Sequence, residues 1–209
     1  MTSAPLTPTR SVPSRLIPPR LVLGSTSRYR AELLRRLCAD FEQRAPGTDE
    51  TALADETPSA RALRLAIAKA EAAASGLDDA LVIGSDQVAE LDGLMLDKPG
   101  TSERALAQLT ASSGREVQFH TALCLLDTRD GHRLTHVDHT RVRFRYLSAL
   151  EIARYVEREQ PLDCAGSFKC EGLGISLFES IDNQDPSALI GLPLIALAQM
   201  LRECGMALP

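Results

Sequence analysis

Apolar residues recur along this chain at two spacings, which predict strands and helices in alternation. A short apolar run over 21–23 has the length of a buried strand, and apolar side chains at helical spacing follow over 29–37. A second strand is predicted over 41–45. Threonine and proline at 57–58 are typical of a helix start, and Gly76 is expected to end the same helix.

The rest of the pattern predicts a long hairpin and three more helices. Strands are expected over 81–88, 116–126, 135–146 and 175–178, with a tight turn over 91–94. Helices are expected over 101–112, 148–159 and 188–204. Ser148 and Glu151 have the spacing of a capping box. Because only a short turn joins the two longest strands, they pair antiparallel, and we expect an α/β fold with a mixed sheet flanked by helices.

Composition separates the first 20 residues from the rest. Five of the twelve prolines and three arginines lie over 1–20, and this stretch contains no acidic residue. We expect a disordered, proline-rich extension there and a single α/β domain over 21–209. The 209 residues are 44% hydrophobic and 24% charged, which is enough chain to bury a substantial core.

Net charge and cysteine spacing argue against several partners. The formal net charge is −5 and no run of Lys and Arg forms a basic stripe, which argues against a polynucleotide partner. No apolar run approaches the roughly 18 residues of a membrane span. The five cysteines include no C-x-x-C pair and make no zinc pattern with the four histidines. We therefore expect reduced thiols and a cytoplasmic protein.

The turn between the first strand and the first helix carries candidate anion-binding groups. One glycine and three hydroxyl residues span 24–27, and Arg28 and Arg30 follow in the first helical turn. Arginines at a helix N-terminus oppose the helix dipole unless an anion binds there. Hydroxyls, backbone N–H groups and guanidinium groups together favour a phosphate-bearing ligand. The alternative is that Ser27 caps the helix and both arginines are solvated.

Polar residues end the third predicted strand. Ser85, Asp86 and Gln87 stand where open α/β sheets place their sites. Asp86 is suited to accept a proton from water or to bind a metal ion that lowers the pKa of water, and the sequence leaves both roles open. Its alternative role is to cap a following turn. Glu50 or Asp49 is the candidate for a second oxygen ligand to Mg²⁺ or Mn²⁺.

Three motifs, in order along the chain, carry a family resemblance. In the segments over 25–34, 84–88 and 165–174 the chain resembles the Maf family of nucleoside triphosphate pyrophosphatases. Further matches in the same order are Pro46 to Glu50, Lys69, Lys98-Pro99 and Ile190 to Pro193. The second and third motifs look like the branch that acts on 7-methyl-GTP. The branch that acts on dTTP and UTP more typically has Asp-Thr at the second motif and Gln in place of Glu171.

The resemblance implies a fold, a reaction and a set of site residues. The fold is an elongated mixed β-sheet flanked by helices with a central nucleotide-binding cleft, similar to that of inosine triphosphate pyrophosphatases. The reaction is hydrolysis to a nucleoside monophosphate and pyrophosphate, with a divalent metal cation as cofactor and often in a homodimer. Asp86 matches the catalytic proton acceptor, and base specificity is implied for Tyr29, Gln87 and Glu171. The matching polar cleft residues are Ser25, Arg30, Glu50, Lys69 and Lys98.

The cleft residues divide into phosphate and metal candidates. Arg30 offers a bidentate fork to triphosphate oxygens, and Lys69 and Lys98 offer point charges. Ser25 adds a hydroxyl beside them. The alternative for both lysines is a solvated surface position. Glu50 joins Asp86 as a candidate metal ligand.

Base selection follows from hydrogen bonding and charge. Glu171 suits guanine, because one carboxylate accepts from both N1–H and the 2-amino group. Methylation at N7 makes the base cationic, and a cation stacked on Tyr29 gains about 0.5–2 kcal/mol. Gln87 is a candidate to hold the base edge or the ribose. The alternative for Tyr29 is a core position in its helix. Arg28 departs from the family, which usually has Pro there, and Cys170 stands where Ser is more usual.

The sequence therefore predicts an enzyme that hydrolyses 7-methyl-GTP to 7-methyl-GMP and pyrophosphate and so clears modified nucleotides. Two alternatives stay open. One is the same chemistry on dTTP and UTP. The other is a nucleotide-binding regulator of cell division, in which hydrolysis is incidental. Loss of the Asp86 carboxylate distinguishes the regulator from an enzyme, because the regulator tolerates that loss and an enzyme does not.

Overall fold

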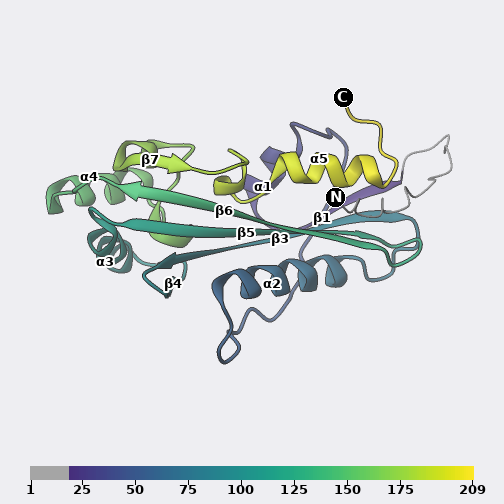
Figure 1. The fold of residues 1–209 in the computed structure, drawn as a ribbon, viewed down its shortest axis with the longest axis horizontal. Coiled ribbons are helices and arrows are strands. Elements are labelled where there is room, and N and C mark those ends of the chain that lie inside the picture. The colour runs from purple at the N-terminus through teal and green to yellow at the C-terminus, as the bar shows by residue number, and fades with distance from the viewer. Residues whose placement is uncertain (1–18) are drawn as a thin grey trace, which may run out of the picture.

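The computed structural model describes residues 19–209, whose strands and helices alternate along much of the chain (Figure 1). The strands are β1 (Arg20–Gly24), β2 (Glu42–Arg44), β3 (Ala80–Leu91), β4 (Leu94–Leu96), β5 (Glu116–Asp127), β6 (Arg133–Phe144) and β7 (Phe178–Asp182). The helices are α1 (Arg28–Leu34), α2 (Pro58–Ala73), α3 (Ser102–Ser112), α4 (Ala149–Glu159) and α5 (Leu194–Glu203). The extension predicted over 1–20 lies outside the described residues, except for its last two positions.

All seven strands of residues 19–209 belong to one mixed sheet. Its order is β2-β1-β3-β5-β6-β7, and β4 also pairs with β3. β1 pairs parallel with β2 and β3, whereas β3, β5, β6 and β7 pair antiparallel in succession. A tight turn joins β5 and β6, and such a turn permits only antiparallel pairing. The predicted mixed sheet with its long hairpin is confirmed.

Helices cover both faces of the sheet, and the described residues form four apolar clusters against it, of which two are large. In Figure 1, α2 lies along one face while α1 and α5 lie on the other. One core, beneath α1 and α5, contains Leu23, Leu33 and Leu201. The second core, around α3 and α4, contains Phe119 and Ile152. The cores lie one after the other along the sheet, so the molecule is elongated, as predicted.

A glycine in β3 lets α2 approach the sheet closely. A Cβ added at Gly84 would stand 2.1 Å from the Ala66 carbonyl oxygen and 2.6 Å from the Ala70 nitrogen, both in the α2 backbone. Ala66 and Ala70 are themselves fully buried, so small side chains meet on both sides of this contact. Because side chains alternate along a strand, Asp86 faces α2 as Gly84 does. The close approach therefore sets the distance between α2 and Asp86.

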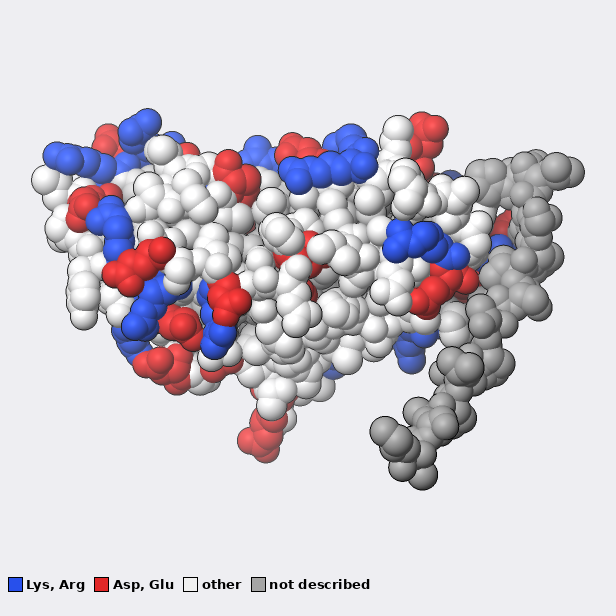
Figure 2. Space-filling model, turned by 45° about the horizontal axis from the view of Figure 1, so that its top comes forward, with Lys and Arg blue, Asp and Glu red and all other residues white. Residues whose placement is uncertain are grey.

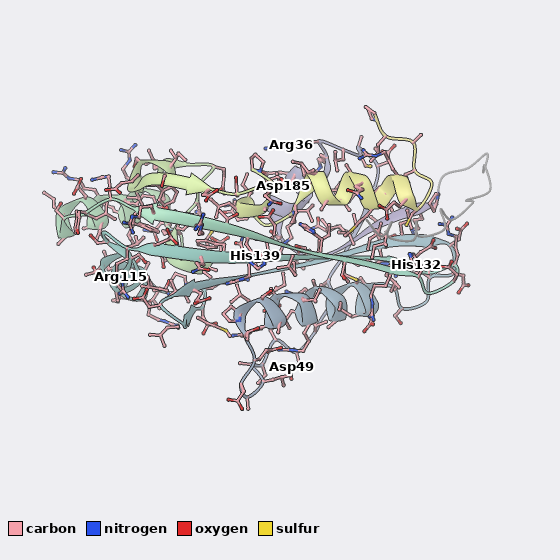
Figure 3. All side chains as sticks on the ribbon, viewed as in Figure 1. Arg36, Asp49, Arg115, His132, His139 and Asp185 are labelled. Carbon is pink, nitrogen blue, oxygen red and sulfur yellow. The ribbon has the colours of Figure 1, made fainter. Side chains whose placement is uncertain are left out.

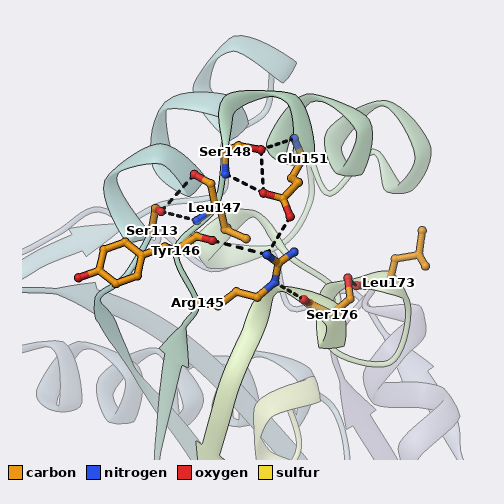
Figure 4. Close-up of polar contacts among 8 residues, drawn as sticks. All are labelled: Ser113, Arg145, Tyr146, Leu147, Ser148, Glu151, Leu173 and Ser176. Carbon is orange, nitrogen blue, oxygen red and sulfur yellow. Dashed lines mark hydrogen bonds and ion pairs between the residues drawn. The ribbon is translucent and has the colours of Figure 1, made fainter.

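A capping box begins α4, as predicted (Figure 4). The Ser148 N–H donates to the Glu151 carboxylate over 2.8 Å, and the Glu151 N–H donates to the Ser148 hydroxyl over 3.3 Å. Arg145 donates to the same carboxylate over 2.8 Å and to the Ser176 carbonyl over 2.8 Å. Hydrogen bonds from Ser148 and then from Arg145 lower the pKa of Glu151 to about 2. This cluster ties the start of α4 to the segment that precedes β7.

The strand predicted over 175–178 is wrong. Leu173–Leu177 forms a 3₁₀ helix, and β7 begins only at Phe178. The Ser176 hydroxyl donates back to the Leu173 carbonyl over 2.7 Å, which favours a closed turn over an extended chain. The side chain of Ile175 is exposed and does not supply the buried face that a strand there would need.

The last helix begins later than predicted. α5 starts at Leu194, whereas the pattern predicted a helix from position 188. A short 3₁₀ turn over Ala188–Ile190 comes first, and Gly191 then adopts a φ of +124° that right-handed helices do not allow. Pro193 lacks the N–H that a continuous helix would use. The chain therefore bends before α5, and this bend borders the site described below.

Charges of both signs are mixed over the surface. In Figure 2 they gather at the end of the molecule that holds α3 and α4, and the face shown carries no continuous basic track. Within residues 19–209, no helix has the length and apolar character needed to cross a membrane.

Candidate active site

A cavity opens where one edge of β3 is left without a partner strand. β1 pairs with β3 only as far as Ile83, and β4 begins its pairing at Ala89. β5 pairs with the opposite edge of β3 along this part of the strand. β1 and β4 therefore share the other edge, and residues 84–88 have no partner strand on that edge. A cavity of about 340 Å³ is lined by this interval.

The polar residues of β3 lie inside the strand, not at its end as predicted. β3 continues through Ser85, Asp86 and Gln87 to Leu91. Asp86 therefore does not cap a turn. Alternation directs Asp86 to the α2 face and its two neighbours to the opposite face. One strand segment thus supplies two walls of the cavity.

A cluster of two buried charges and one exposed carboxylate joins α2, β3 and the loop before α2. The Lys69 ammonium lies 2.5 Å from the Asp86 carboxylate and 2.6 Å from the Glu50 carboxylate. Lys69 and Asp86 are both buried, so a solvated position for Lys69 is excluded. Burial raises the pKa of Glu50, but the hydrogen bond and charge of Lys69 outweigh this, so the pKa lies below its ordinary value.

Asp49 takes no part in this cluster. Its carboxylate accepts from the Thr51 N–H over 2.9 Å and from the Thr51 hydroxyl over 2.6 Å. Figure 3 places Asp49 in the loop that projects beyond α2, away from the sheet. Of the two carboxylates considered for this loop, Glu50 is the one that lines the cavity.

Arg30 is held at the base of the turn that follows β1. Its Nε donates to the Gly191 carbonyl over 2.8 Å, and its Nη1 lies 3.4 Å from the Ser25 hydroxyl. Burial lowers the pKa of Arg30, and the charges of Asp86 and Glu50 partly offset that effect. Ser27 caps α1 by accepting from the Arg30 N–H over 3.4 Å. The cap is therefore present, but Arg30 is partly buried and bound to protein groups instead of standing free in solvent.

A second hollow of about 390 Å³ adjoins the cavity at this turn. It is lined by all four phosphate candidates: Ser25, Arg30, Lys69 and Lys98. Lys98 is exposed, and its charge is among those that lower the pKa of Glu50. Arg28, Tyr29 and Glu50 line the same hollow. The structure thus brings the predicted phosphate residues together.

Gln87 and Ser85 connect β3 to the bend before α5. The Gln87 amide nitrogen lies 2.9 Å from the Thr121 hydroxyl and 3.1 Å from the carbonyls of Ala188 and Leu189. The Ser85 hydroxyl lies 3.0 Å from the carbonyl of Gly191. These bonds place the bend against the cavity, which Gln87 itself lines.

Asp185 holds the other side of the same bend (Figure 3). This buried carboxylate accepts from the Ile195 N–H over 2.7 Å and from the Ser187 N–H over 2.9 Å. It thereby satisfies a backbone donor at the start of α5, where Pro193 supplies no side-chain cap. The loop that carries the Gly191 carbonyl, to which Arg30 donates, is therefore held by β3 on one side and by Asp185 on the other.

Two more of the predicted base-specificity residues also line the cavity. Tyr29 and Glu171 both line it, with Tyr29 partly buried and Glu171 exposed. The Arg28 guanidinium lies 4.7 Å from the centre of the Tyr29 ring and donates to its hydroxyl over 2.7 Å. Burial raises the pKa of Tyr29. The Cys170 thiol lies 3.6 Å from the Glu171 carboxylate, and burial raises the pKa of this thiol to about 12.

Several lining residues escaped the sequence-based prediction, among them Asp163, Phe119 and Phe168. Phe168 lies inside the third motif, and Asp163 precedes it, so both were open to prediction. The rings of Phe119 and Phe168 meet edge to face with centroids 5.2 Å apart, which makes an apolar wall. Phe119 comes from β5 and carries no local signal, because only the fold brings it to the cavity.

The side chains that line the site indicate which kind of metal ion it suits. Within residues 19–209, no cluster of three or more His, Cys, Asp or Glu is arranged to hold a metal ion. Glu50 and Asp86 nevertheless converge on one point, because both contact the Lys69 nitrogen. Mg²⁺ is commonly held by one or two carboxylates together with substrate phosphates. The two carboxylates fit a hard divalent ion that arrives with phosphate, and they do not form a complete protein cage.

The fold and site define an α/β protein with a charged cleft at an unpaired strand edge, and comparison with known proteins agrees with this class. The family model described as "Maf-like protein" matches residues 20–204. The chain therefore belongs to the Maf-like family, and the predicted family is confirmed.

Several relatives share more than half of their residues with this chain. A 7-methyl-GTP pyrophosphatase of Burkholderia pseudomallei (strain 1710b) is 59% identical over 191 residues, which cover 90% of this chain and 89% of the relative. A 7-methyl-GTP pyrophosphatase of Xanthomonas axonopodis pv. citri (strain 306) is 56% identical and covers 91% of this chain and 100% of the relative. Among solved structures, the Staphylococcus aureus Ham1 protein aligns with a TM-score of 0.48 and 18% identity, over 87% of this chain and 98% of that chain.

Proposed function

We propose that this protein is a nucleoside triphosphate pyrophosphatase that hydrolyses 7-methyl-GTP to 7-methyl-GMP and pyrophosphate. The observation that carries the proposal is one continuous cavity. It is lined by the Lys69–Asp86–Glu50 cluster, in which Lys69 and Asp86 are buried, by Arg30, and by Tyr29 and Glu171. Membership of the Maf-like family and the names of relatives that are more than half identical support the same reaction.

Asp86 is proposed as the group that accepts a proton from the attacking water. The water oxygen bonds to phosphorus while the bond between the α and β phosphates breaks and pyrophosphate leaves. Lys69 donates to Asp86 over 2.5 Å and so holds the carboxylate in one orientation. Glu50 and Asp86 are the residues that would hold Mg²⁺ or Mn²⁺, which when bound neutralises phosphate charge and lowers the pKa of water.

Phosphoryl transfer depends mainly on positioning and electrostatics. We assign Arg30, Lys69 and Lys98 to the triphosphate oxygens, with the Ser25 hydroxyl beside them. Arg30 is already oriented by the Gly191 carbonyl over 2.8 Å, so less side-chain freedom is lost when substrate binds. Burial strengthens its interaction with an anion, because water competes less for the guanidinium.

Glu171, Tyr29 and Gln87 are assigned to the base. Glu171 is exposed within the cavity and is proposed to accept from the guanine N1–H and 2-amino groups. Tyr29 offers an aromatic face to the methylated, cationic base. The amide nitrogen of Gln87 is bound to protein acceptors, so we propose that Gln87 acts mainly by holding the bend that borders the base.

The proposal includes the cellular setting. All five cysteines are free thiols, as in most cytosolic proteins, and we place the protein in the cytoplasm. Residues 21–209 are proposed to act as one catalytic domain, with a homodimer as the assembly. Removal of modified nucleotides from the pool is the role that fits the reaction.

The test is pyrophosphate release from 7-methyl-GTP, GTP, dTTP, UTP and CTP, with Mg²⁺ or Mn²⁺, for the wild type and for Asp86→Asn. We expect selective turnover of 7-methyl-GTP that the variant loses by at least about 100-fold. Preference for dTTP and UTP would overturn the base assignment and keep the reaction. No turnover of any nucleotide by the wild type would overturn the enzymatic proposal.

A further inference from the structure

Asp163 is a carboxylate at the junction of the cavity and the second hollow, and no role has yet been given to it. It lines both spaces, as Tyr29 does. It is exposed, and its carboxylate lies 3.5 Å from the thiol of Cys164 on the same wall. A negative charge here repels a nucleotide triphosphate unless a positive charge lies close by.

In the structure, Arg28 supplies that positive charge. Its guanidinium stacks 4.7 Å from the centre of the Tyr29 ring. The hydrogen bond to Tyr29 raises the pKa of Arg28 most, and the negative charge of Asp163 raises it further. Arg28, Tyr29 and Asp163 line the second hollow together, so a flat, delocalised cation already lies on this ring beside the same hollow as the Asp163 carboxylate. A guaninium ring methylated at N7 is a cation of the same kind, with an equally flat face.

We propose that Asp163, together with the Tyr29 ring, forms a subsite for the positive charge of the methylated base, so that Asp163 selects 7-methyl-GTP over GTP. This inference rests on the proposed function. The roles of the two carboxylates then differ. Glu171 reads the N1–H and 2-amino edge, which both nucleotides share, whereas Asp163 responds to the charge that only the methylated base carries. When the base takes the place of the Arg28 guanidinium on the Tyr29 ring, the methylated base restores the positive charge, whereas a neutral guanine leaves the repulsion between Asp163 and the triphosphate uncompensated.

Asp163→Asn tests this role, because it removes the charge and keeps the shape. We expect the ratio of kcat/KM for 7-methyl-GTP over GTP to fall about threefold to fivefold, as for exposed charge pairs, mainly through a higher KM for 7-methyl-GTP. The wild-type ratio should also fall with added salt, while the ratio of the variant should not, because salt screens only charge interactions.

Asp97→Asn is the matched control. Asp97 is an exposed carboxylate on the same cavity, but it lies 3.9 Å from Arg61 and does not line the second hollow that Tyr29 and Asp163 share. Its loss should leave the nucleotide ratio unchanged. An unchanged ratio in Asp163→Asn, or an equal loss in Asp97→Asn, would overturn the inference and keep the proposed function. A wild type that does not hydrolyse 7-methyl-GTP would overturn both.

Discussion

Replacement of Gly84 by alanine tests whether the approach of α2 to the sheet controls the site. The added Cβ would meet the Ala66 carbonyl oxygen at 2.1 Å and the Ala70 nitrogen at 2.6 Å. Both atoms belong to the helix backbone, so no side-chain rotation relieves the contact and α2 has to move outwards. The same helix carries Lys69, which holds Asp86 over 2.5 Å. Stability and catalysis should therefore fall together.

The size of both effects follows from this geometry. Overpacking a tight core costs about 1–3 kcal/mol, and contact with backbone atoms belongs at the upper end of that range. For a domain of this length, each kcal/mol lowers Tm by about 2–4 °C, so we expect a Tm about 6–12 °C below that of the wild type. A shift of Lys69 by a fraction of an ångström should lower kcat by up to about 100-fold.

The assay compares thermal unfolding with kcat for 7-methyl-GTP, measured well below both midpoints. Gly131→Ala is the control, because Gly131 lies in the turn between β5 and β6 with a φ of +72°, and the described residues leave space for a Cβ there. It should cost about 1–2 kcal/mol of backbone strain without changing kcat. A further change of Ala70 to glycine should not rescue Gly84→Ala, since the closest contacts are with backbone. A Gly84→Ala variant with wild-type kcat would refute the link between helix approach and catalysis.

Three further predictions rest on single contacts. Lys69→Met leaves Asp86 buried without its cation, so the free energy of unfolding, measured in urea, should fall by about 3–5 kcal/mol, and turnover of every nucleotide should be lost; a stable, active variant would contradict the ion cluster. Glu171→Gln should lower kcat/KM for guanine nucleotides relative to UTP by about tenfold or more, as expected when a paired hydrogen-bond acceptor is lost, and equal ratios across bases would remove Glu171 from base selection. Hydrogen bonds from Ser148 and then Arg145 depress the pKa of Glu151 from 4.5 to about 2, so its stabilising effect is present above pH 4.5 and is lost as the pH falls towards 2. Thermal unfolding of Glu151→Gln over that range should show a flatter acid profile than the wild type, whereas parallel profiles would exclude this linkage.

Local signals predicted most of the helices and strands. Thr57 accepts from the Ala60 N–H over 3.2 Å, and Ser148 and Glu151 exchange bonds across one helical turn. Because such caps join residues three positions apart, the sequence alone reveals them. The strand predicted over 175–178 was wrong. A serine hydroxyl closes a turn there, and the spacing of apolar residues does not reveal that hydrogen bond.

The sequence predicted which residues form the site better than it predicted how those residues are arranged. The motifs named Arg30, Asp86 and Glu171, and all three line one cavity. The burial of Lys69 was not evident, because its spacing in α2 also suits a surface position. Phe119 was missed, since a residue inside a long strand gives no local sign of the cavity that it borders.

The family, the alternation of strands and helices, and the set of charged groups available for chemistry all follow from the chain without its fold. These features depend on the order of residues and on hydrogen bonds between near neighbours. Which charges meet depends on how distant segments fold together. Arg30 reaches the Gly191 carbonyl across 161 positions of the chain, and Lys69 reaches Asp86 because Gly84 lets α2 lie against the sheet. Such contacts arise when distant segments pack, and the packing depends on steric fit that no single stretch of sequence encodes.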